Sequence, residues 1–226
     1  GQLDTELIIL PKEITGITVS DDTNTYDFNQ NLKFEFDKTT TAHKLDIKLN
    51  NEKLPEYILL NVNNENVTEV SLKENGKYVI KLVVNDKNYK EITHIIEVYI
   101  YVAMSSESTN YQNPTRYLTV GEAIEATKNA QTQTYLYLFA SDTLDDKLNT
   151  TYEIGKNVIL YIPHELRTKY IAYTKDSDLE TNTSPNGVSS TPKLFTNLTI
   201  KQNITVIVNG KIEIGANRGQ EQPLVN

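Results

Sequence analysis

The sequence contains no cysteine, no tryptophan and only one methionine. Without cysteine no disulfide can form, and this excludes the disulfide framework on which small animal ectodomains usually depend. A cysteine-free chain is compatible with the cytosol, and equally with a bacterial surface protein that is stabilised by its β-sheets.

Long apolar runs are also missing. No stretch approaches the roughly 20 apolar residues that a membrane-spanning helix needs, so we expect no membrane insertion of this segment. The opening GQLDTELIIL has no basic region and is therefore not typical of a signal peptide. Whether the chain is a piece of a longer protein stays open.

Positive charge is in deficit, since 22 Lys and Arg stand against 30 Asp and Glu and the formal net charge is −8. Nucleic acids and anionic membranes are bound by basic surfaces, so we expect neither as a partner. Solubility is the simplest explanation of an acidic balance.

The chain is rich in tyrosine, with 14 residues, and its 226 residues suggest one large domain or two ordinary ones. Up to residue 103 it consists of short apolar runs separated by turn-forming residues, as in NNEKLP and NDKN. Short strands at this spacing predict an all-β, immunoglobulin-like β-sandwich over 1–103. The expected strands cover 7–10, 16–20, 32–36, 45–49, 57–62, 67–72, 76–86 and 92–102.

The end of this region, ENGKYVIKLVVNDKN followed by IIEVYIYV, resembles the last two strands of bacterial immunoglobulin-like modules of the PKD or cadherin-like type. The matching residues are Gly76, Tyr78, Val84 and Asp86. The tryptophan found in many such modules is missing. The resemblance implies a spacer or a stalk that presents another domain.

Residues 104–117 are polar, contain Pro114 and show no periodicity, so we expect a linker there. A second domain is expected over 118–226. It opens with a helix at 119–131, where Thr119 and Glu122 form a capping box and an apolar stripe runs along one face: Val120, Ala123, Ile124, Thr127 and Ala130. A strand at 135–140 follows.

Two later stretches nearly repeat each other: YEIGKNVILYIP (152–163) and LTIKQNITVIVN (198–209). When the two stretches are aligned, Asn157 falls on Asn203 and Leu160 on Val206. Alternation repeated in this way predicts a parallel β-solenoid, in which stacked coils bury a common core. The paired asparagines are then expected at a coil corner, as part of an asparagine ladder. The alternative is two antiparallel strands that merely share a pattern.

The order helix, strand, turn, strand in 117–217 resembles the opening of right-handed β-helix proteins of the pectate-lyase-like superfamily. The matching segments are LTVGEAIEATKNA, TYLYLFA, TYEIGKNVILYIP and LTIKQNITVIVNGKIEIG. The resemblance implies a helix that caps the N-terminal end of a solenoid. The superfamily contains polysaccharide lyases and hydrolases as well as adhesins without catalysis.

Candidate site residues are few. We expect no catalytic residues and no cofactor, because Glu153 and Glu213 are single acids on solvent faces. The turn that contains Asp142, Asp145 and Asp146 is explained as a solvated acidic turn. His43, His94 and His164 show no metal-ligand spacing. N-glycosylation sequons occur at Asn66, Asn149, Asn182, Asn197 and Asn203.

Metal binding is left open at two acidic loops, because Ca²⁺ prefers several oxygen ligands from a flexible loop. One loop is DDTNTYD, with Asp21, Asp22, Asn24 and Asp27. The other is DSDLE, with Asp176, Asp178 and Glu180. Neither has the glycine and the distal glutamate of an EF-hand loop.

These patterns favour a non-catalytic, extracellular structural or adhesive protein of a bacterial cell surface: a stalk, a surface-layer component or a filament component. The expected partners are a second copy bound head to tail, a surface glycan or a host protein. The alternatives are the N-terminal part of a carbohydrate-active β-helix enzyme, or a carbohydrate-binding module.

Overall fold

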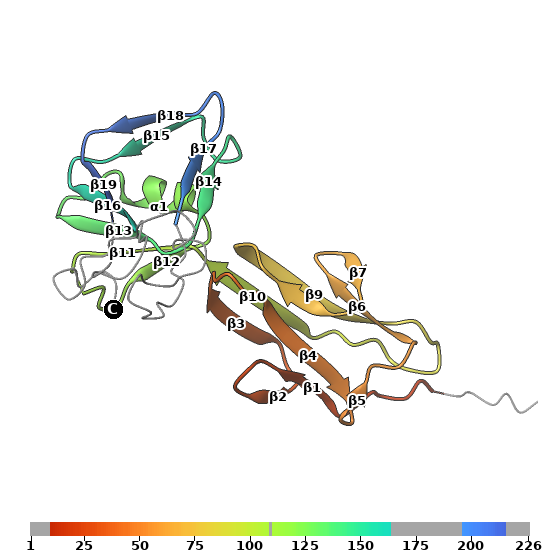
Figure 1. Cartoon of the computed structure of the whole chain (residues 1–226). Coiled ribbons are helices and arrows are strands. Elements are labelled where there is room, and N and C mark those ends of the chain that lie inside the picture. Colours follow the sequence, from red (N-terminus) through yellow and green to blue (C-terminus); the bar gives the residue numbers. More distant parts are fainter. Residues whose placement is uncertain (1–9, 109, 164–195, 216–226) are drawn as a thin grey trace, which may run out of the picture. The chain divides into compact units, whose positions relative to one another are not determined.

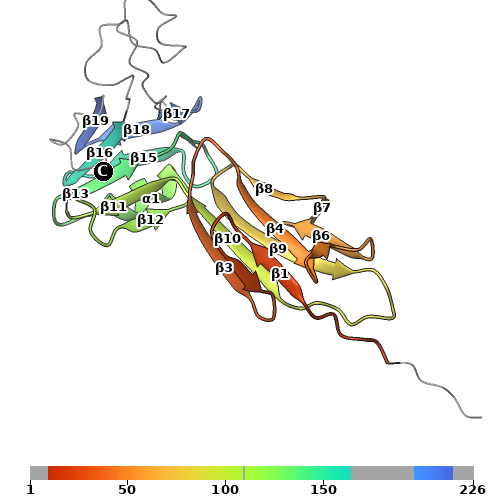
Figure 2. The same ribbon diagram turned by 60° about the horizontal axis from the view of Figure 1, so that its bottom comes forward.

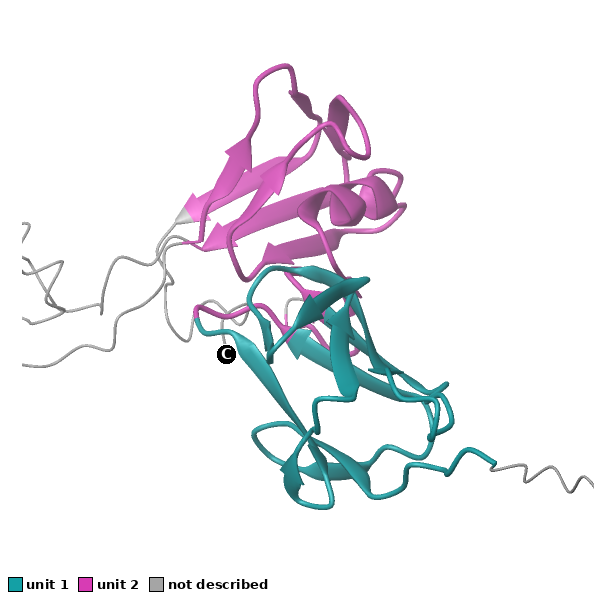
Figure 3. Ribbon diagram, turned by 90° about the vertical axis from the view of Figure 1, so that its right-hand side faces the viewer, with its two compact units in different colours: residues 1–36, 41–99 teal, residues 37–40, 100–226 magenta. Residues whose placement is uncertain are grey.

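The computed structural model describes residues 10–108, 110–163 and 196–215, which are mostly β-strands (Figure 1). The chain divides into two compact units, shown in Figure 3. Unit 1 comprises residues 1–36 and 41–99, and unit 2 comprises residues 37–40 and 100–226. The all-β class expected from the sequence is confirmed.

Unit 1 contains two five-stranded sheets (Figure 2). The first has the order β2-β1-β4-β5, with β8 also paired to β4: β2 (Thr25–Asp27), β1 (Ile17–Ser20), β4 (His43–Leu49), β5 (Glu52–Lys53) and β8 (Val70–Leu72). The second has the order β3-β10-β9-β6-β7: β3 (Leu32–Asp37), β10 (Ile95–Tyr101), β9 (Gly76–Val84), β6 (Ile58–Val62) and β7 (Glu65–Val67).

Alternation explains these strands. In β10 every second residue is buried, and Ile96, Val98 and Ile100 are fully inaccessible to solvent. One face of each sheet is therefore apolar and must be covered. The sequence missed the short strands β2, β5 and β7, whose largely exposed residues carry no such alternation. The expected strand at 7–10 lies almost wholly outside the described residues.

The expectation of a linker over 104–117 is wrong. The range contains most of β11 (Ala103–Ser106) and all of β12 (Thr115–Tyr117), two strands of unit 2 that pair antiparallel with each other. β11 also pairs antiparallel with β13 (Thr134–Leu138). Polar residues suit these positions because β12 is an edge strand with exposed residues.

The helix α1 (Val120–Thr127) begins where the sequence predicts. The Thr119 hydroxyl accepts the N–H of Glu122, and the Glu122 carboxylate accepts the N–H of Thr119, so the capping box is confirmed. The buried residues are Val120, Gly121, Ala123, Ile124 and Thr127. The helix is shorter than expected, ending before Lys128, whose N–H bonds the carbonyl of Ile124.

The rest of unit 2 passes through three lines of strands in a fixed order (Figure 1). We call β13, β14 (Asp142–Leu144) and β15 (Thr151–Ile154) the first circuit. The second circuit is β16 (Val158–Pro163), β17 (Leu198–Ile200) and β18 (Thr205–Val208), and β19 (Lys211–Gly215) opens a third. Each strand pairs in parallel with its counterpart in the next circuit: β13 with β16, β14 with β17, β15 with β18, and β16 with β19.

The alignment that puts Leu160 on Val206 is wrong. Leu160 in β16 pairs with Ile212 in β19, whereas Val206 in β18 pairs with Tyr152 in β15. The two stretches look alike because each contains inward-facing alternation, and alternation alone does not distinguish one line of strands from the next.

The asparagine ladder is therefore also wrong. Asn157 precedes β16 and donates from its side chain to the carbonyls of Ala130 and Gln131. Asn203 precedes β18, which belongs to another sheet. Asn203 does adopt the left-handed backbone expected of a corner asparagine, with φ of 71°.

The core of unit 2 lies between the helix and the circuits. It includes Val120 and Ile124 from α1, and Leu136, Ile154 and Leu160 from the strands, all of them buried. At one corner the backbones touch: an ideal Cβ at Gly155 would lie 1.9 Å from the Lys128 carbonyl oxygen, and one at Gly210 would lie 2.1 Å from the Gly155 carbonyl oxygen. Only glycine allows circuits to approach this closely at the corner.

Candidate functional site

The most distinctive surface of unit 2 is where the second circuit ends. Leu144, Ile154 and Ile162 are buried, and each pairs across a parallel ladder with an apolar residue of the next circuit. Those partners are Ile200, Val208 and Ile214, whose exposed fractions are 49%, 48% and 69%. Each buried residue is covered by the circuit beyond it, whereas its partner has no circuit beyond it among the described residues.

The backbone at this end is also open. Within the described part of the chain, β17 pairs only with β14, β18 only with β15, and β19 only with β16. The outer edges of these strands thus present N–H and C=O groups that no described strand satisfies. We call β17, β18 and β19, with the exposed Ile200, Val208 and Ile214, the open edge.

The opposite side of the first circuit is covered. Helix α1 packs against β13, β14 and β15, and an ideal Cβ at Gly121 would lie 3.1 Å from the Tyr152 ring. The carboxylate of Asp142 in β14 accepts the N–H of Val120 at 2.7 Å, at the first turn of the helix. Among the described residues, the apolar side chains are therefore covered by α1 at one end of unit 2 and exposed at the other, although β14 and β15 at the covered end also pair with one strand each.

Charged groups lie beside the open edge. The Lys201 ammonium is 3.6 Å from the Asp145 carboxylate, and Lys211 forms an ion pair with Glu213. The N–H of Lys147 and the charges of Lys147 and Lys201 hold the pKa of Asp145 below its usual range against the opposing effect of burial. Asp142, by contrast, accepts a hydrogen bond from the first turn of α1. The carboxylates of Asp142 and Asp145 therefore make separate contacts and do not form one site.

The first acidic loop is a structural turn. One oxygen of Asp21 accepts the N–H of Thr23, the hydroxyl of Thr23 and the N–H of Asn24, at 2.7–2.8 Å. Burial would raise the pKa of Asp21, but the hydrogen bonds from Asn24 and Thr23 outweigh it and lower the pKa. Across residues 10–108, 110–163 and 196–215 no three His, Cys, Asp or Glu residues are grouped as metal ligands.

The remaining predicted sites are dispersed. Asp176, Asp178, Glu180, His164 and Asn182 lie outside the described residues. His43 stacks on Phe36 with ring centroids 4.4 Å apart, and His94 meets Phe28 edge to face, so both pack as aromatic groups. Asn66, Asn197 and Asn203 are exposed, and Asn149 is partly buried.

The described residues also form two shallow grooves. One, in unit 1, has a volume of about 640 Å³ and is lined by residues 13–17, 27–29 and 90–94. At its rim Lys90 pairs with Glu13 at 2.7 Å and lowers the pKa of that carboxyl. The other, the polar groove of unit 2, is lined largely by hydroxyls and amides, among them Ser105, Gln112, Asn113, Thr127 and Thr134, with the carboxylate of Glu107 beside them.

Sequence reasoning missed a tyrosine cluster. Tyr111, Tyr137 and Tyr161 are buried together, with the rings of Tyr137 and Tyr161 stacked at 5.7 Å. They lie on the face of β13 and β16 opposite to Leu136 and Leu160. The sequence does contain a signal for this cluster. In TYLYL tyrosine and leucine alternate, so both faces of the strand are apolar and each face needs a layer that covers it.

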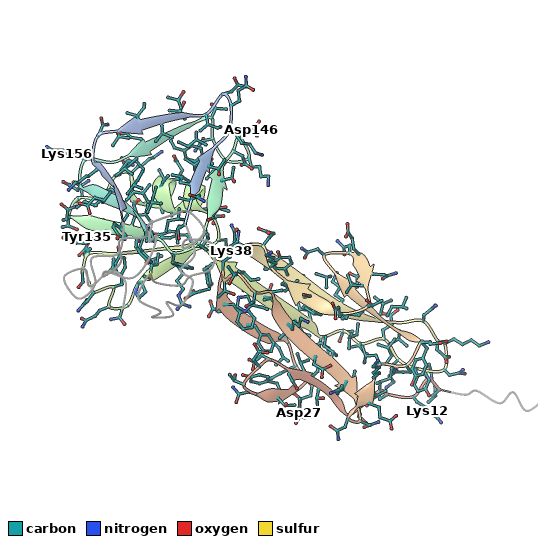
Figure 4. All side chains as sticks on the ribbon, viewed as in Figure 1. Lys12, Asp27, Lys38, Tyr135, Asp146 and Lys156 are labelled. Atoms are coloured by element: carbon teal, nitrogen blue, oxygen red, sulfur yellow. The ribbon has the colours of Figure 1, made fainter. Side chains whose placement is uncertain are left out.

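Figure 4 shows charged side chains spread over both units, at positions such as Lys12, Asp27, Asp146 and Lys156. The helix α1 has 8 residues, and the described ranges hold no helix of the length and apolar character that crossing a bilayer requires. Comparisons with models of protein families, with curated proteins and with solved structures find no match.

Proposed function

We propose that this chain is a non-catalytic structural or adhesive protein of a bacterial cell surface, acting outside the cell as a stalk, a surface-layer component or a filament component. In this proposal unit 1 is an immunoglobulin-like sandwich of the PKD or cadherin-like type. Unit 2 is the helix-capped start of a right-handed β-solenoid of the pectate-lyase-like kind.

The observation that carries the proposal is the parallel register of unit 2. Thr134 pairs with Val158, Asp142 with Leu198, and Thr151 with Thr205, so the chain returns to the same three lines. In a stack of this kind each circuit contacts only its neighbours, so circuits can be added without changing the contacts of the others. Such an arrangement suits an extended scaffold. The regular elements of unit 1 among the described residues are all strands, which suits the spacer role that its resemblance implies.

The cellular location of the chain tests this proposal. Intact cells of the source bacterium are treated with a protease, and the chain is followed with an antibody raised against unit 1. We expect cleavage on intact cells, with a cytosolic marker protein left whole. Protection of the chain until the cells are lysed would contradict a surface location.

Carbohydrate binding is the second candidate function, and the polar groove of unit 2 favours it. Hydroxyl and amide groups such as those of Ser105, Gln112 and Asn113 are the partners that sugar hydroxyls use in hydrogen bonds. Binding to an array of surface glycans decides between a purely structural role and an adhesive or carbohydrate-binding role. Gln112→Ala and Asn113→Ala should weaken any such binding, whereas Lys156→Ala, outside the groove, should not.

A further inference from the structure

The two ends of unit 2 differ in a way that restricts how copies can associate. At one end the apolar residues of the first circuit are covered by α1 of the same chain. At the other end, the open edge presents backbone groups that no described strand pairs with, together with exposed apolar side chains. The strands β14 and β15 also pair with one described strand each, but α1 covers the apolar residues against which the open edge of a second copy would pack.

We infer that two copies of this chain associate through their open edges, end to end, about a two-fold axis. The inference rests on the proposed scaffold function and is an alternative to the head-to-tail contact expected from the sequence. Head-to-tail stacking would form a filament that grows without limit, whereas an end-to-end contact uses the same surface on both copies and closes as a dimer.

Symmetry fixes which strands meet. The three lines of strands follow one another around unit 2 (Figure 1), and a two-fold axis across the open edge reverses the direction of travel in the second copy. All new strand contacts are consequently antiparallel. β18 meets β18 of the second copy, and β17 meets β19 of the second copy, so all three open strands gain a partner at once.

Charge selects the register between β17 and β19. The core-facing residues of β17 must lie opposite the core-facing residues of β19 from the second copy. One register that meets this condition places Ile200 opposite Ile212 of the second copy, and Lys201 then faces Lys211. Moving by two residues places Ile200 opposite Ile214, two side chains that are 49% and 69% exposed. Lys201 then faces Glu213, and the two-fold axis forms this oppositely charged contact twice.

A second copy fits the open edge better than other occupants. A single extended peptide satisfies one strand edge only, and a lipid surface supplies no regular row of backbone donors and acceptors. The matching set of three strand edges, with their apolar residues turned inward, is present on the chain itself. The molecule is thus self-complementary at this surface.

Charge reversal tests the inference by sedimentation equilibrium of the full chain. We expect a dimer for the native protein. For Lys201→Glu and for Glu213→Lys the dissociation constant of the dimer should be at least about tenfold larger, because each variant places like charges opposite each other twice. The double variant Lys201→Glu with Glu213→Lys restores opposite charges and should restore the dimer.

Lys147→Glu is the matched control. Lys147 approaches the same Asp145 carboxylate, at 3.5 Å, but it lies between β14 and β15 of the first circuit and not in or next to β17, β18 or β19. Thermal melts confirm that each variant is folded. The inference is overturned by a native chain that stays monomeric at high concentration, by polymers without a size limit, or by a double variant that remains as weak as the single ones.

The failures of the two proposals are distinguishable. The dimer is measured with purified protein and the surface location with intact cells. A surface-exposed chain that stays monomeric would remove the end-to-end dimer alone. A dimer formed by a chain that proves to be intracellular would remove only the surface role.

Discussion

Gly155 and Gly210 lie at one corner of unit 2, in successive circuits, where one backbone lies directly against the next. Gly155→Ala would place a Cβ 1.9 Å from the Lys128 carbonyl oxygen, and Gly210→Ala would place one 2.1 Å from that of Gly155. Because backbone cannot move aside as a flexible side chain can, each substitution should lower the free energy of unfolding by more than about 2 kcal/mol. Urea unfolding measures the loss. The exposed Lys156→Ala, at the same corner, should change it little.

Tyr111 makes the free energy of unfolding depend on pH. Burial, followed by the neighbouring Tyr137, Tyr135 and Tyr161, raises the pKa of Tyr111 above its ordinary value of 10.0. The folded state therefore holds the phenolic proton more tightly than the unfolded state does. The resulting stability is fully present below pH 10 and is lost as the pH rises toward the folded pKa.

Tyr111→Phe should remove part of this alkaline loss. Within the described ranges the Tyr111 hydroxyl is buried without a hydrogen-bond partner, so its removal should leave stability at pH 8 unchanged or slightly higher. Tyr78→Phe is the contrast, because the Tyr78 hydroxyl donates to the Glu74 carbonyl at 2.8 Å. That variant should lose about 1 kcal/mol at pH 8. Urea unfolding at pH 8 and pH 11 compares the two, and equal behaviour would argue against the buried, unpartnered hydroxyl.

Among the elements, α1 depends on contacts made at its first turn. Thr119→Ala removes the acceptor for the Glu122 N–H and should lower the free energy of unfolding by about 1 kcal/mol. Thr119→Ser keeps the acceptor and should cost much less. Circular dichroism during urea unfolding measures both, and an equal loss in the two variants would show that packing of the threonine methyl, rather than capping, is responsible.

The strands of unit 2 show where sequence reasoning reached its limit. The correct repeat places NTTYEI over NITVIV, so that Thr151 pairs with Thr205 and Ile154 with Val208. Two sequons, at Asn149 and Asn203, mark this register in the sequence, but a sequon by itself does not predict which strands pair. The match of 152–163 with 198–209 is longer and more apolar than this correct repeat. It is nevertheless misleading, because a period of two fits any strand with one face toward the core.

For the whole molecule, the number of strand neighbours predicts local stability. Among the described strands, β13 and β16 have a paired strand on both sides, whereas β17 and β18 have one. Amide hydrogen exchange at low protein concentration should accordingly be slowest in β13 and β16 and faster in β17 and β18. Mass spectrometry of peptides from each strand measures this order, and uniform protection across both circuits would contradict it.

The sequence by itself determined the β-rich class, most strands of unit 1, and the start of α1, because alternation and capping are local properties of neighbouring residues. Repeated apolar alternation also led to the prediction of a β-solenoid, which stays a prediction. Only the tertiary structure decided which strands lie side by side, that 103–106 and 115–117 join the sheet of unit 2, and that Ile200, Val208 and Ile214 form the open edge. These features depend on pairings between residues far apart in the chain, and a period-two pattern is compatible with many such pairings.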